Sequence, residues 1–545
     1  MDDEVILKNY SDDSDNISLT ETAEPPSDLI LPLLRHQKER LAWSLKQEES
    51  TFKGGILADE MGMGKTVQAI ALVLAQCKLK IDSSILSSSP STSQELPTVK
   101  GTLVVCPVIG ALQWFREIER CTTKDSNKTL LYHGTNRGKF TNNLEEYDFV
   151  ITTYSTIQAD YMPKKSKQNS KNSKLCDEGS SDNSVSVGED VSRRKSVLHS
   201  VKWDHIILDE AHHIKSVSTP TTKAVLALES FYKWALTGTP LQNHIGELYS
   251  LCRPGPYRHA RHFLWWKKYI ENPLANTRYM YERIHGDAMV LLKHKILKSL
   301  MLRRTKKERV ADLSLPTKTV IMRKDSLDVN EFNYYKSLHN ISREQLDRYV
   351  EDGTLMNNYG HIFSMIARLR QAADHRYLVM YSRKELASGN KKAGDVEQLC
   401  GLCHDAVEDP VLSGINCIQL VGSMSIAARD ATDSKFTEDS DCRILLMSLK
   451  ARGVALNLTV ASHVFLMDPW WNPAVEQQAQ DRIHRIGQYK PVKVVRFMME
   501  NTIEENIIEL QEKKKLLFEG TVGGSSEALG KLTEEDLKIL FHCRI

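Results

Sequence analysis

Short apolar runs alternate with amphipathic segments over two long parts of the chain. In the first part, residues 29–252, β-branched runs at 103–105, 149–151 and 206–208 are bounded by polar turns and spaced widely enough for helices between them. This alternation is typical of a parallel sheet covered by helices. The second part covers residues 414–545, with expected strands at 417–421, 444–448, 463–467 and 492–497 and a helix over 504–516. The pattern predicts an α/β protein with two lobes.

The remaining segments differ from these two parts in composition. Residues 1–28 are acidic and rich in serine, and residues 160–200 hold few apolar side chains, so we expect a disordered tail and a disordered insertion in the first lobe. The basic clusters of that insertion fit a nuclear-localisation signal or a solvated loop. Residues 253–394 have a mostly helical pattern and are expected to link the lobes.

Charge and cysteine content restrict the class of protein. The chain has 545 residues, and its 72 basic side chains nearly cancel its 70 acidic ones. Any nucleic-acid contact must therefore come from local basic surfaces. The ten cysteines are scattered, which favours a reducing compartment, cytosol or nucleus. Because no apolar run approaches the ~20 residues that span a bilayer, we expect no membrane association.

A glycine-rich loop follows the apolar stretch at 55–58 and precedes a helical stretch at 67–74. Strand, loop and helix in this order are the context of a phosphate-binding loop. Glycines let backbone amides approach phosphates, the lysine reaches the β- and γ-phosphates, and the threonine hydroxyl binds magnesium. A glycine-rich turn before a core helix is the alternative. The expected ATP-binding residues are Asp59, Glu60, Met61, Gly62, Met63, Gly64, Lys65 and Thr66.

Two adjacent carboxylates, Asp209 and Glu210, end the apolar run at 206–208. Asp209 is placed to hold magnesium, and Glu210 is placed to orient and deprotonate the attacking water. An ordinary solvated turn is the alternative for this pair. Farther upstream, the amide of Gln37 suits the edge of an adenine, although a lone glutamine is weak evidence. The sequence thus favours ATP hydrolysis as the chemistry of the first lobe.

Arg482 and Arg485 lie three residues apart in the second lobe, so in a helix they share one face. Such a pair can act as arginine fingers, worth ~10³–10⁵ in rate in other enzymes. From the sequence pattern alone, a pair of surface arginines is the better reading.

Together these segments resemble the helicase-like ATPases of superfamily two, of the switch/sucrose-nonfermenting type. The closer resemblance is to the Rad-sixteen branch, DNA-repair translocases with a RING finger between their lobes, because Cys400-Gly401-Leu402-Cys403 follows the element at 369–375. The resemblance covers about residues 31–541. Its segments are 59–66, 103–118, 209–212, 236–243, 302–306, 369–375, 468–473 and 478–488.

This resemblance implies two RecA-like lobes with ATP and magnesium between them. It also implies tracking along double-stranded DNA without strand separation, a nuclear role in nucleotide-excision repair or chromatin, and a protein partner in a repair complex. Movement along the phosphate backbone of DNA needs only local basic side chains, since phosphate contacts are independent of base sequence. The resemblance assigns Arg482 and Arg485 to catalysis. Candidate DNA-facing residues are Gln113, Trp114, Thr239, Gln242 and Asn472.

The chain departs from the family pattern in the stretch 395–413, a RING remnant. A RING needs eight Cys or His ligands for two zinc ions, whereas Cys400 and Cys403 supply half of one site. We therefore expect no ubiquitin-ligase activity and regard these cysteines as weak zinc ligands. The chain then passes to Gly414 without the strand and helix that open the family's second lobe, so we expect an incomplete sheet there. The alternative to a translocase is accordingly an ATP-binding but catalytically impaired module that binds DNA or a partner.

Overall fold

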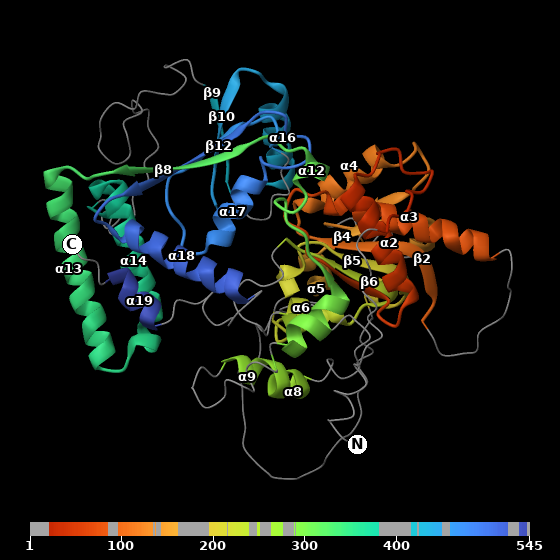
Figure 1. Ribbon diagram of the computed structural model, residues 1–545, viewed down its shortest axis with the longest axis horizontal. Coiled ribbons are helices and arrows are strands. Elements are labelled where there is room, and N and C mark those ends of the chain that lie inside the picture. The colour runs from red at the N-terminus through yellow and green to blue at the C-terminus, as the bar shows by residue number, and fades with distance from the viewer. Residues whose placement is uncertain are drawn as a thin grey trace, which may run out of the picture.

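The computed structural model describes residues 21–84, 96–134, 137, 143–161, 196–214, 216–238, 248–250, 263–275, 288, 290–380, 416–421, 424–449, 458–521 and 534–541. Several predictions fall outside these residues: the tail up to residue 20, most of the 160–200 insertion, Thr239, Gln242, Cys400 and Cys403. Two lobes lie side by side, one red to yellow and the other green to blue (Figure 1). None of the described helices is long and apolar enough to cross a membrane.

Lobe 1 is built on a seven-stranded sheet of order β3-β4-β2-β5-β6-β1-β7, in which all the pairings are parallel. The three runs predicted as strands, at 103–105, 149–151 and 206–208, are confirmed within β2, β4 and β5. The strands are β1 (Gly54–Leu57), β2 (Thr98–Cys106), β3 (Thr129–Leu131), β4 (Phe149–Thr153), β5 (Lys202–Leu208), β6 (Glu229–Leu236) and β7 (Met301–Leu302).

Both faces of this sheet are buried, as a parallel sheet requires. Successive residues point to opposite faces: Leu103 belongs to one apolar cluster with Trp203 and Ile206, and Val104 belongs to the other with Ile207. The surrounding helices are α2 (Arg35–Glu49), α3 (Lys65–Ser84), α4 (Gly110–Cys121), α5 (Tyr154–Tyr161), α6 (Pro220–Leu226), α8 (Phe263–Trp266), α9 (Asn272–Ala275) and α11 (Lys298–Leu300). There are also the 3-10 turns η2 (Leu144–Glu146), η3 (Val197–His199) and η4 (Ala211–Ile214) and the π-helical segments η5 (Lys267–Glu271) and η7 (Leu291–Leu297).

The prediction of a helical linker over residues 253–394 is wrong at two places. β7 pairs with β1 through Met301 and Leu302 and so completes the lobe 1 sheet. β8 (Lys318–Asp325) pairs with a late strand and belongs to lobe 2. Between them lies the short helix α12 (Val310–Leu313). Residues 303–317 therefore form the direct connection between the two sheets.

Lobe 2 contains two separate parallel sheets, β10-β9 and β11-β12-β8, among the described residues. The four predicted strands are confirmed within one or two residues at most ends, as β9 (Asn416–Leu420), β10 (Cys442–Met447), β11 (His463–Leu466) and β12 (Val492–Met499). Side chains of both sheets pack in one apolar cluster around Leu420, Leu466 and Val494.

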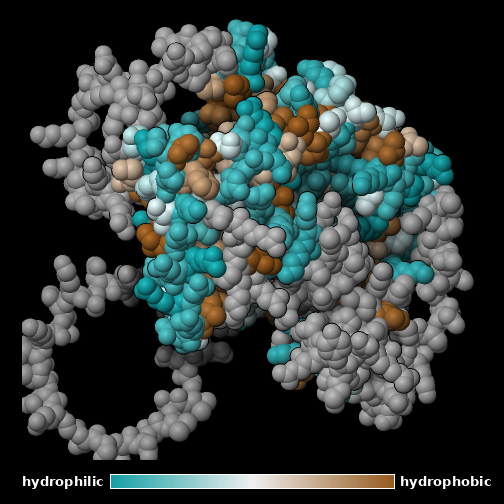
Figure 2. Space-filling view, turned by 60° about the vertical axis from the view of Figure 1, so that its left-hand side comes forward, coloured by the Kyte–Doolittle hydropathy of each residue, from teal (hydrophilic) through white to brown (hydrophobic). Residues whose placement is uncertain are grey.

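Large apolar side chains are exposed on these strands. Ile444 and Leu446 of β10, Phe465 of β11 and the adjoining Met467 are 40–65% exposed. The view that brings the lobe 2 side forward has hydrophobic patches within a mostly hydrophilic surface (Figure 2). An open strand edge with apolar side chains is prone to pair with other chains.

Six further helices complete lobe 2. α13 begins with a capping box, in which Asp328 accepts from the amide of Glu331 and Glu331 caps in return. The apolar faces of α13, α14, α18 and α19 share one cluster that includes Tyr335, Leu369 and Ile507. These helices are α13 (Val329–Glu351), α14 (Tyr359–Asp374), α16 (Ile426–Glu438), α17 (Pro473–Asp481), α18 (Ile503–Thr521) and α19 (Glu534–Phe541), with the turn η8 (Leu355–Asn358).

The last residues of the predicted disordered tail are ordered against α2. Lys38 forms an ion pair of 2.8 Å with Glu24, and Lys46 pairs with Glu21. The amide of Ala23 also donates to the carbonyl of Lys38. The acidic composition of residues 21–28 therefore reflects pairing with basic side chains of α2, and the prediction of disorder is wrong for them.

Candidate active site between the lobes

The phosphate loop has the geometry that its sequence predicts. β1 ends at Leu57, α3 begins at Lys65, and Gly62 and Gly64 between them adopt φ values of 85° and 79°. Such left-handed conformations favour glycine. A Cβ atom would also lie 2.5 Å from the Arg485 Cβ at position 62 and 2.5 Å from the Gln37 Nε2 at position 64. The loop therefore needs glycine both for its turn and for the close approach of its neighbours.

Lys65 lies at the centre of the site. Its ammonium donates to the backbone carbonyls of Asp59, at 2.8 Å, and Glu60, at 3.2 Å. Burial lowers the pKa of Lys65, while the carboxylates of Glu210, Asp59 and Asp209 oppose that shift. The arrangement holds a cation beside the loop amides, which is the charge that a bound phosphate requires.

Three residues predicted to bind nucleotide are turned away from it. Asp59 is fully buried, and its carboxylate receives two guanidinium bonds from Arg304, at 3.1 Å to Oδ1 and 2.5 Å to Oδ2. The carboxylate of Glu60 accepts from the amide of Lys306 at 2.8 Å. Met63 is buried and contributes only backbone hydrogen bonds. These side chains stabilise the loop from behind, so the prediction that these three residues bind nucleotide rests on their backbone amides.

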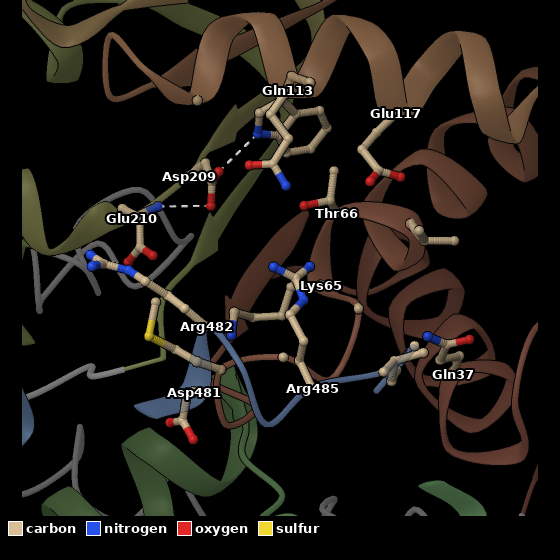
Figure 3. Close-up of a pocket in the computed structure, with 18 of the residues that line it drawn as sticks. Gln37, Lys65, Thr66, Gln113, Glu117, Asp209, Glu210, Asp481, Arg482 and Arg485 are labelled. Atoms are coloured by element: carbon tan, nitrogen blue, oxygen red, sulfur yellow. Dashed lines mark hydrogen bonds between the residues drawn. The ribbon is translucent and has the colours of Figure 1, made fainter. Parts of the chain in front are cut away.

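Asp209 follows β5 and is held by two donors. The indole Nε1 of Trp114 donates to Oδ2 at 2.8 Å, and the amide of Glu210 donates to Oδ1 at 2.9 Å (Figure 3). Burial and the neighbouring Glu210 carboxylate raise the pKa of Asp209 to about 6. Two adjacent carboxylates in a buried position repel each other, and a divalent cation bound there relieves that repulsion. The oxygen atoms of Asp209 and Thr66 thus suit a magnesium ion.

Glu210 has an unusual backbone for a non-glycine residue, with φ of 46°. Strained residues of this kind cluster at functional sites. Its carboxylate lies 3.1 Å from His212 Nδ1. Burial raises the pKa of Glu210, but His212, Lys65 and His213 outweigh burial, and the net shift is downward. Glu210 is therefore ionised, as a residue that accepts a proton from water must be.

Lobe 2 contributes two arginines to the same site. Arg482 is almost fully buried and reaches toward Glu210 (Figure 3). Burial lowers the pKa of Arg482, and the Glu210 carboxylate opposes that shift. The amide of Ile486, directly after Arg485, donates to the carbonyl of Gly62 at 3.1 Å. The two lobes therefore meet at the phosphate loop itself.

A cavity of about 400 Å³ lies at this meeting point. Its volume is within the range of small-ligand sites. Asp209, Glu210 and Arg482 lie on one side of the cavity, and Gln37 lies on the other (Figure 3). Its lining includes Leu31, Pro32, Leu34, Gln37, Met61, Gly62, Gly64, Lys65, Thr66, Gln113, Trp114, Glu117, Arg120, Asp209, Glu210, His212, Gln478, Asp481, Arg482, Arg485 and Gly487.

The candidate DNA-facing residues have different outcomes. Trp114 is buried and bonded to Asp209, so its assignment to DNA is wrong. Gln113 lines the cavity beside it and is partly buried, and Asn472 is partly buried, so both remain predictions. The correction for Trp114 has a simple cause: α4 begins shortly after β2, so its first turn faces the carboxyl ends of the strands.

The sequence interpretation missed the contribution of residues 303–306. Arg303 donates to the carbonyls of Ala58 and Gly238, at 3.1 and 3.3 Å, and Arg304 clamps Asp59. The cluster of basic residues after Leu302 was a visible signal, because buried arginines and lysines require partners. Nothing in the sequence pattern indicated which partners they have.

The structure has the features of a nucleoside triphosphatase of the helicase-like class. These features are parallel sheets, a phosphate loop, a carboxylate pair after a strand and arginines from a second lobe. Residues 36–378 match the SNF2-related domain, and residues 362–487 match the helicase conserved C-terminal domain. The chain belongs to the SNF2-related family.

Relatives agree with this assignment. The chain is 34% identical to the "ATP-dependent helicase rhp16" of Schizosaccharomyces pombe, over 95% of this chain and 71% of that protein. It is 30% identical to the "DNA repair protein RAD5B" of Arabidopsis thaliana, over 90% of this chain, but it spans only about half (47%) of that relative's length. The alignment with rhp16 covers 652 positions against the 545 residues of this chain, so that protein has internal segments that this chain lacks.

The chain also matches a solved structure. The chain is 24% identical to the "Sulfolobus solfataricus SWI2/SNF2 ATPase core in complex with dsDNA", over 96% of this chain and all of that one, with a TM-score of 0.41.

Proposed function

We propose that the chain is an ATP-dependent translocase that moves along double-stranded DNA. One observation carries the proposal: Lys65 and Glu210 of lobe 1 share a cavity with Arg482 and Arg485 of lobe 2. A site divided between two lobes opens and closes with the nucleotide, and such closure can be converted into movement along a bound polymer. Membership of the SNF2-related family and a relative named as an ATP-dependent helicase support this reading.

The polar residues named above have separate roles in binding ATP and in its hydrolysis. Lys65 and the loop amides bind the β- and γ-phosphates, and the Gln37 amide with its apolar neighbours binds the base. Thr66 and Asp209 are the residues that would hold magnesium, which neutralises phosphate charge when bound. Glu210 accepts a proton from the attacking water, and Arg482 and Arg485 stabilise charge on the transferring phosphoryl group.

The nucleus is the proposed compartment, and nucleotide-excision repair or chromatin is the proposed process. The support is the repair function printed in the name of the RAD5B relative, together with the basic clusters of the 160–200 insertion. A protein partner in a repair complex is part of the proposal. Zinc is not, because Cys400 and Cys403 supply two of the four ligands that one tetrahedral site needs.

A second candidate function is that of a module that binds ATP but hydrolyses it inefficiently. The two separate sheets of lobe 2 favour it, because a divided sheet positions Arg482 and Arg485 less rigidly than a continuous one. In that case ATP binding survives, and the chain binds DNA or a partner.

Hydrolysis and movement separate these candidates. ATP hydrolysis is measured with and without duplex DNA, and movement is followed by displacement of a third strand from a triplex at the end of the duplex. The translocase proposal predicts DNA-stimulated hydrolysis and triplex displacement, both abolished by Lys65→Ala. Nucleotide binding without DNA stimulation over the Lys65→Ala control would overturn it and support the binding module.

A further inference from the structure

Lys306 occupies a connecting position in the chain. It lies between β7, the last strand of the lobe 1 sheet, and β8, the first strand of lobe 2. Its backbone amide donates to the carboxylate of Glu60 in the phosphate loop at 2.8 Å. Two residues earlier, Arg304 clamps Asp59 of the same loop. The backbone at Lys306 is therefore fixed to the phosphate loop.

The side chain of Lys306 crosses to the other lobe. Its ammonium donates to Asp481 Oδ1 at 2.8 Å and to the carbonyl of His484 at 2.6 Å. The Lys306 side chain is 8% exposed and that of Asp481 is 3% exposed, so water screens this pair little. Breaking a buried pair by removing one partner leaves an uncompensated charge.

The two partners of the ammonium lie on either side of Arg482. Asp481 precedes that arginine, and His484 immediately precedes Arg485. The same turn is held at further points: Gln477 donates to Asp481, at 3.0 Å, and His484 donates through Nε2 to the carbonyl of Pro316, also at 3.0 Å. One ammonium thus fixes the backbone turn from which both arginines enter the cavity.

We propose that Lys306 is a positioning residue that holds the arginine-bearing turn of lobe 2 in register with the phosphate loop of lobe 1. The inference rests on the proposed ATPase function. Because its amide is bonded to the loop and its ammonium to the turn, Lys306 can transmit a movement of either lobe to the other. Lys306 touches no reacting atom, so its loss should weaken binding of the transition state and leave binding of the ground state intact.

The test compares two affinities of the full chain with magnesium: one for fluorescent ADP alone, and one for the same ADP with aluminium fluoride, which mimics the transferring phosphoryl group. Lys306→Met should change the Kd for ADP alone by no more than about twofold. The gain in ADP affinity that aluminium fluoride causes should fall by ~100-fold, which is the effect of a displacement of ~1 Å at a catalytic group. Lys306→Arg, which retains a cation, should recover part of it. Lys307→Met is the matched control, because Lys307 is exposed beside it.

A purely structural role is separated by the double variant Lys306→Met/Asp481→Leu, which removes both buried charges and should restore the thermal midpoint. The proposal predicts that fluoride-dependent tightening stays low in this variant. The proposal would be overturned if the double variant recovered the full gain in affinity together with the thermal midpoint. It would also be overturned if Lys306→Met showed the same gain in affinity on adding aluminium fluoride as the wild type. The measurement needs no DNA, so a wild-type chain that tightens normally but is not stimulated by duplex DNA would count against the translocase proposal alone.

Discussion

Replacement of Gly62 by alanine tests the contact between the two lobes at the phosphate loop. The new Cβ would lie 2.5 Å from the Cβ of Arg485 and 3.1 Å from its Cα. Carbon atoms in contact prefer ~3.5–4.0 Å, so the arginine backbone must retreat by ~1 Å. Rotation of the Arg485 side chain cannot make room for the methyl group, because the clash involves the Cα and Cβ atoms of Arg485.

The expected loss of rate follows from this displacement. A misplacement of ~1 Å can cost ~100-fold in turnover, which corresponds to about 2.7 kcal/mol of activation free energy. The positive φ of 85° at position 62 adds a stability cost of ~1–2 kcal/mol for any L-residue. The stability cost and the rate cost have separate causes and are separable by a control.

Gly134→Ala is that control, because Gly134 has a φ of 76° and no atom within 4 Å of the added Cβ. Both variants should lose similar stability in urea unfolding, and only Gly62→Ala should lose turnover in a steady-state ATPase assay with duplex DNA. If kcat of Gly62→Ala stays within about threefold of Gly134→Ala, the lobes do not meet at this glycine during hydrolysis and the reasoning is refuted.

Three further predictions concern other parts of the chain. Trp114→Phe removes the indole bond to Asp209, so kcat should fall by roughly 10–100-fold while duplex affinity in a fluorescence anisotropy titration stays unchanged; weaker DNA binding at unchanged kcat would contradict this. Burial lowers the pKa of His205, but its two carboxylate neighbours outweigh burial and raise it, so its stabilisation is fully present below pH ~6.5 and is lost as pH rises through the folded pKa. The difference in unfolding free energy between wild type and His205→Gln should therefore shrink from about pH 6 to about pH 9, and a widening difference would sink the argument. Phe465→Lys places a charge on the open edge strand β11 and should reduce self-association in light scattering, whereas unchanged scattering would show that this edge does not pair.

Local features of this chain were predictable because their physical causes are local. The phosphate loop is specified by two glycines and a lysine between a strand and a helix, all within twelve residues or so of each other. The strand before Asp209 ends in the unbroken apolar run Ile206-Ile207-Leu208, which is buried and lies between polar turns, and this pattern favours a strand of a parallel sheet. The resemblance to known ATPases added the role of the two arginines, which their spacing left open.

The errors arose where a residue's partner lies far away in the sequence. Asp59 and Arg304 are separated by 245 positions, and no pattern near Asp59 indicates a buried ion pair. β7 has two residues, too few to show a strand period, and its pairing with β1 depends on the whole lobe 1 sheet. Trp114 was a candidate for DNA contact from the family resemblance, and only the position of α4 in the folded lobe shows that its indole faces Asp209.

The central claim is that one ATP site is completed by both lobes, and single-turnover hydrolysis by Arg485→Ala tests it most directly. The account predicts that ATP affinity changes little, because Lys65 and the loop amides remain, while the rate of hydrolysis falls by ~10³-fold or more, as for the loss of an arginine finger. A variant that binds and hydrolyses ATP at the wild-type rate would contradict the account, since Arg485 would then contribute nothing to the chemistry.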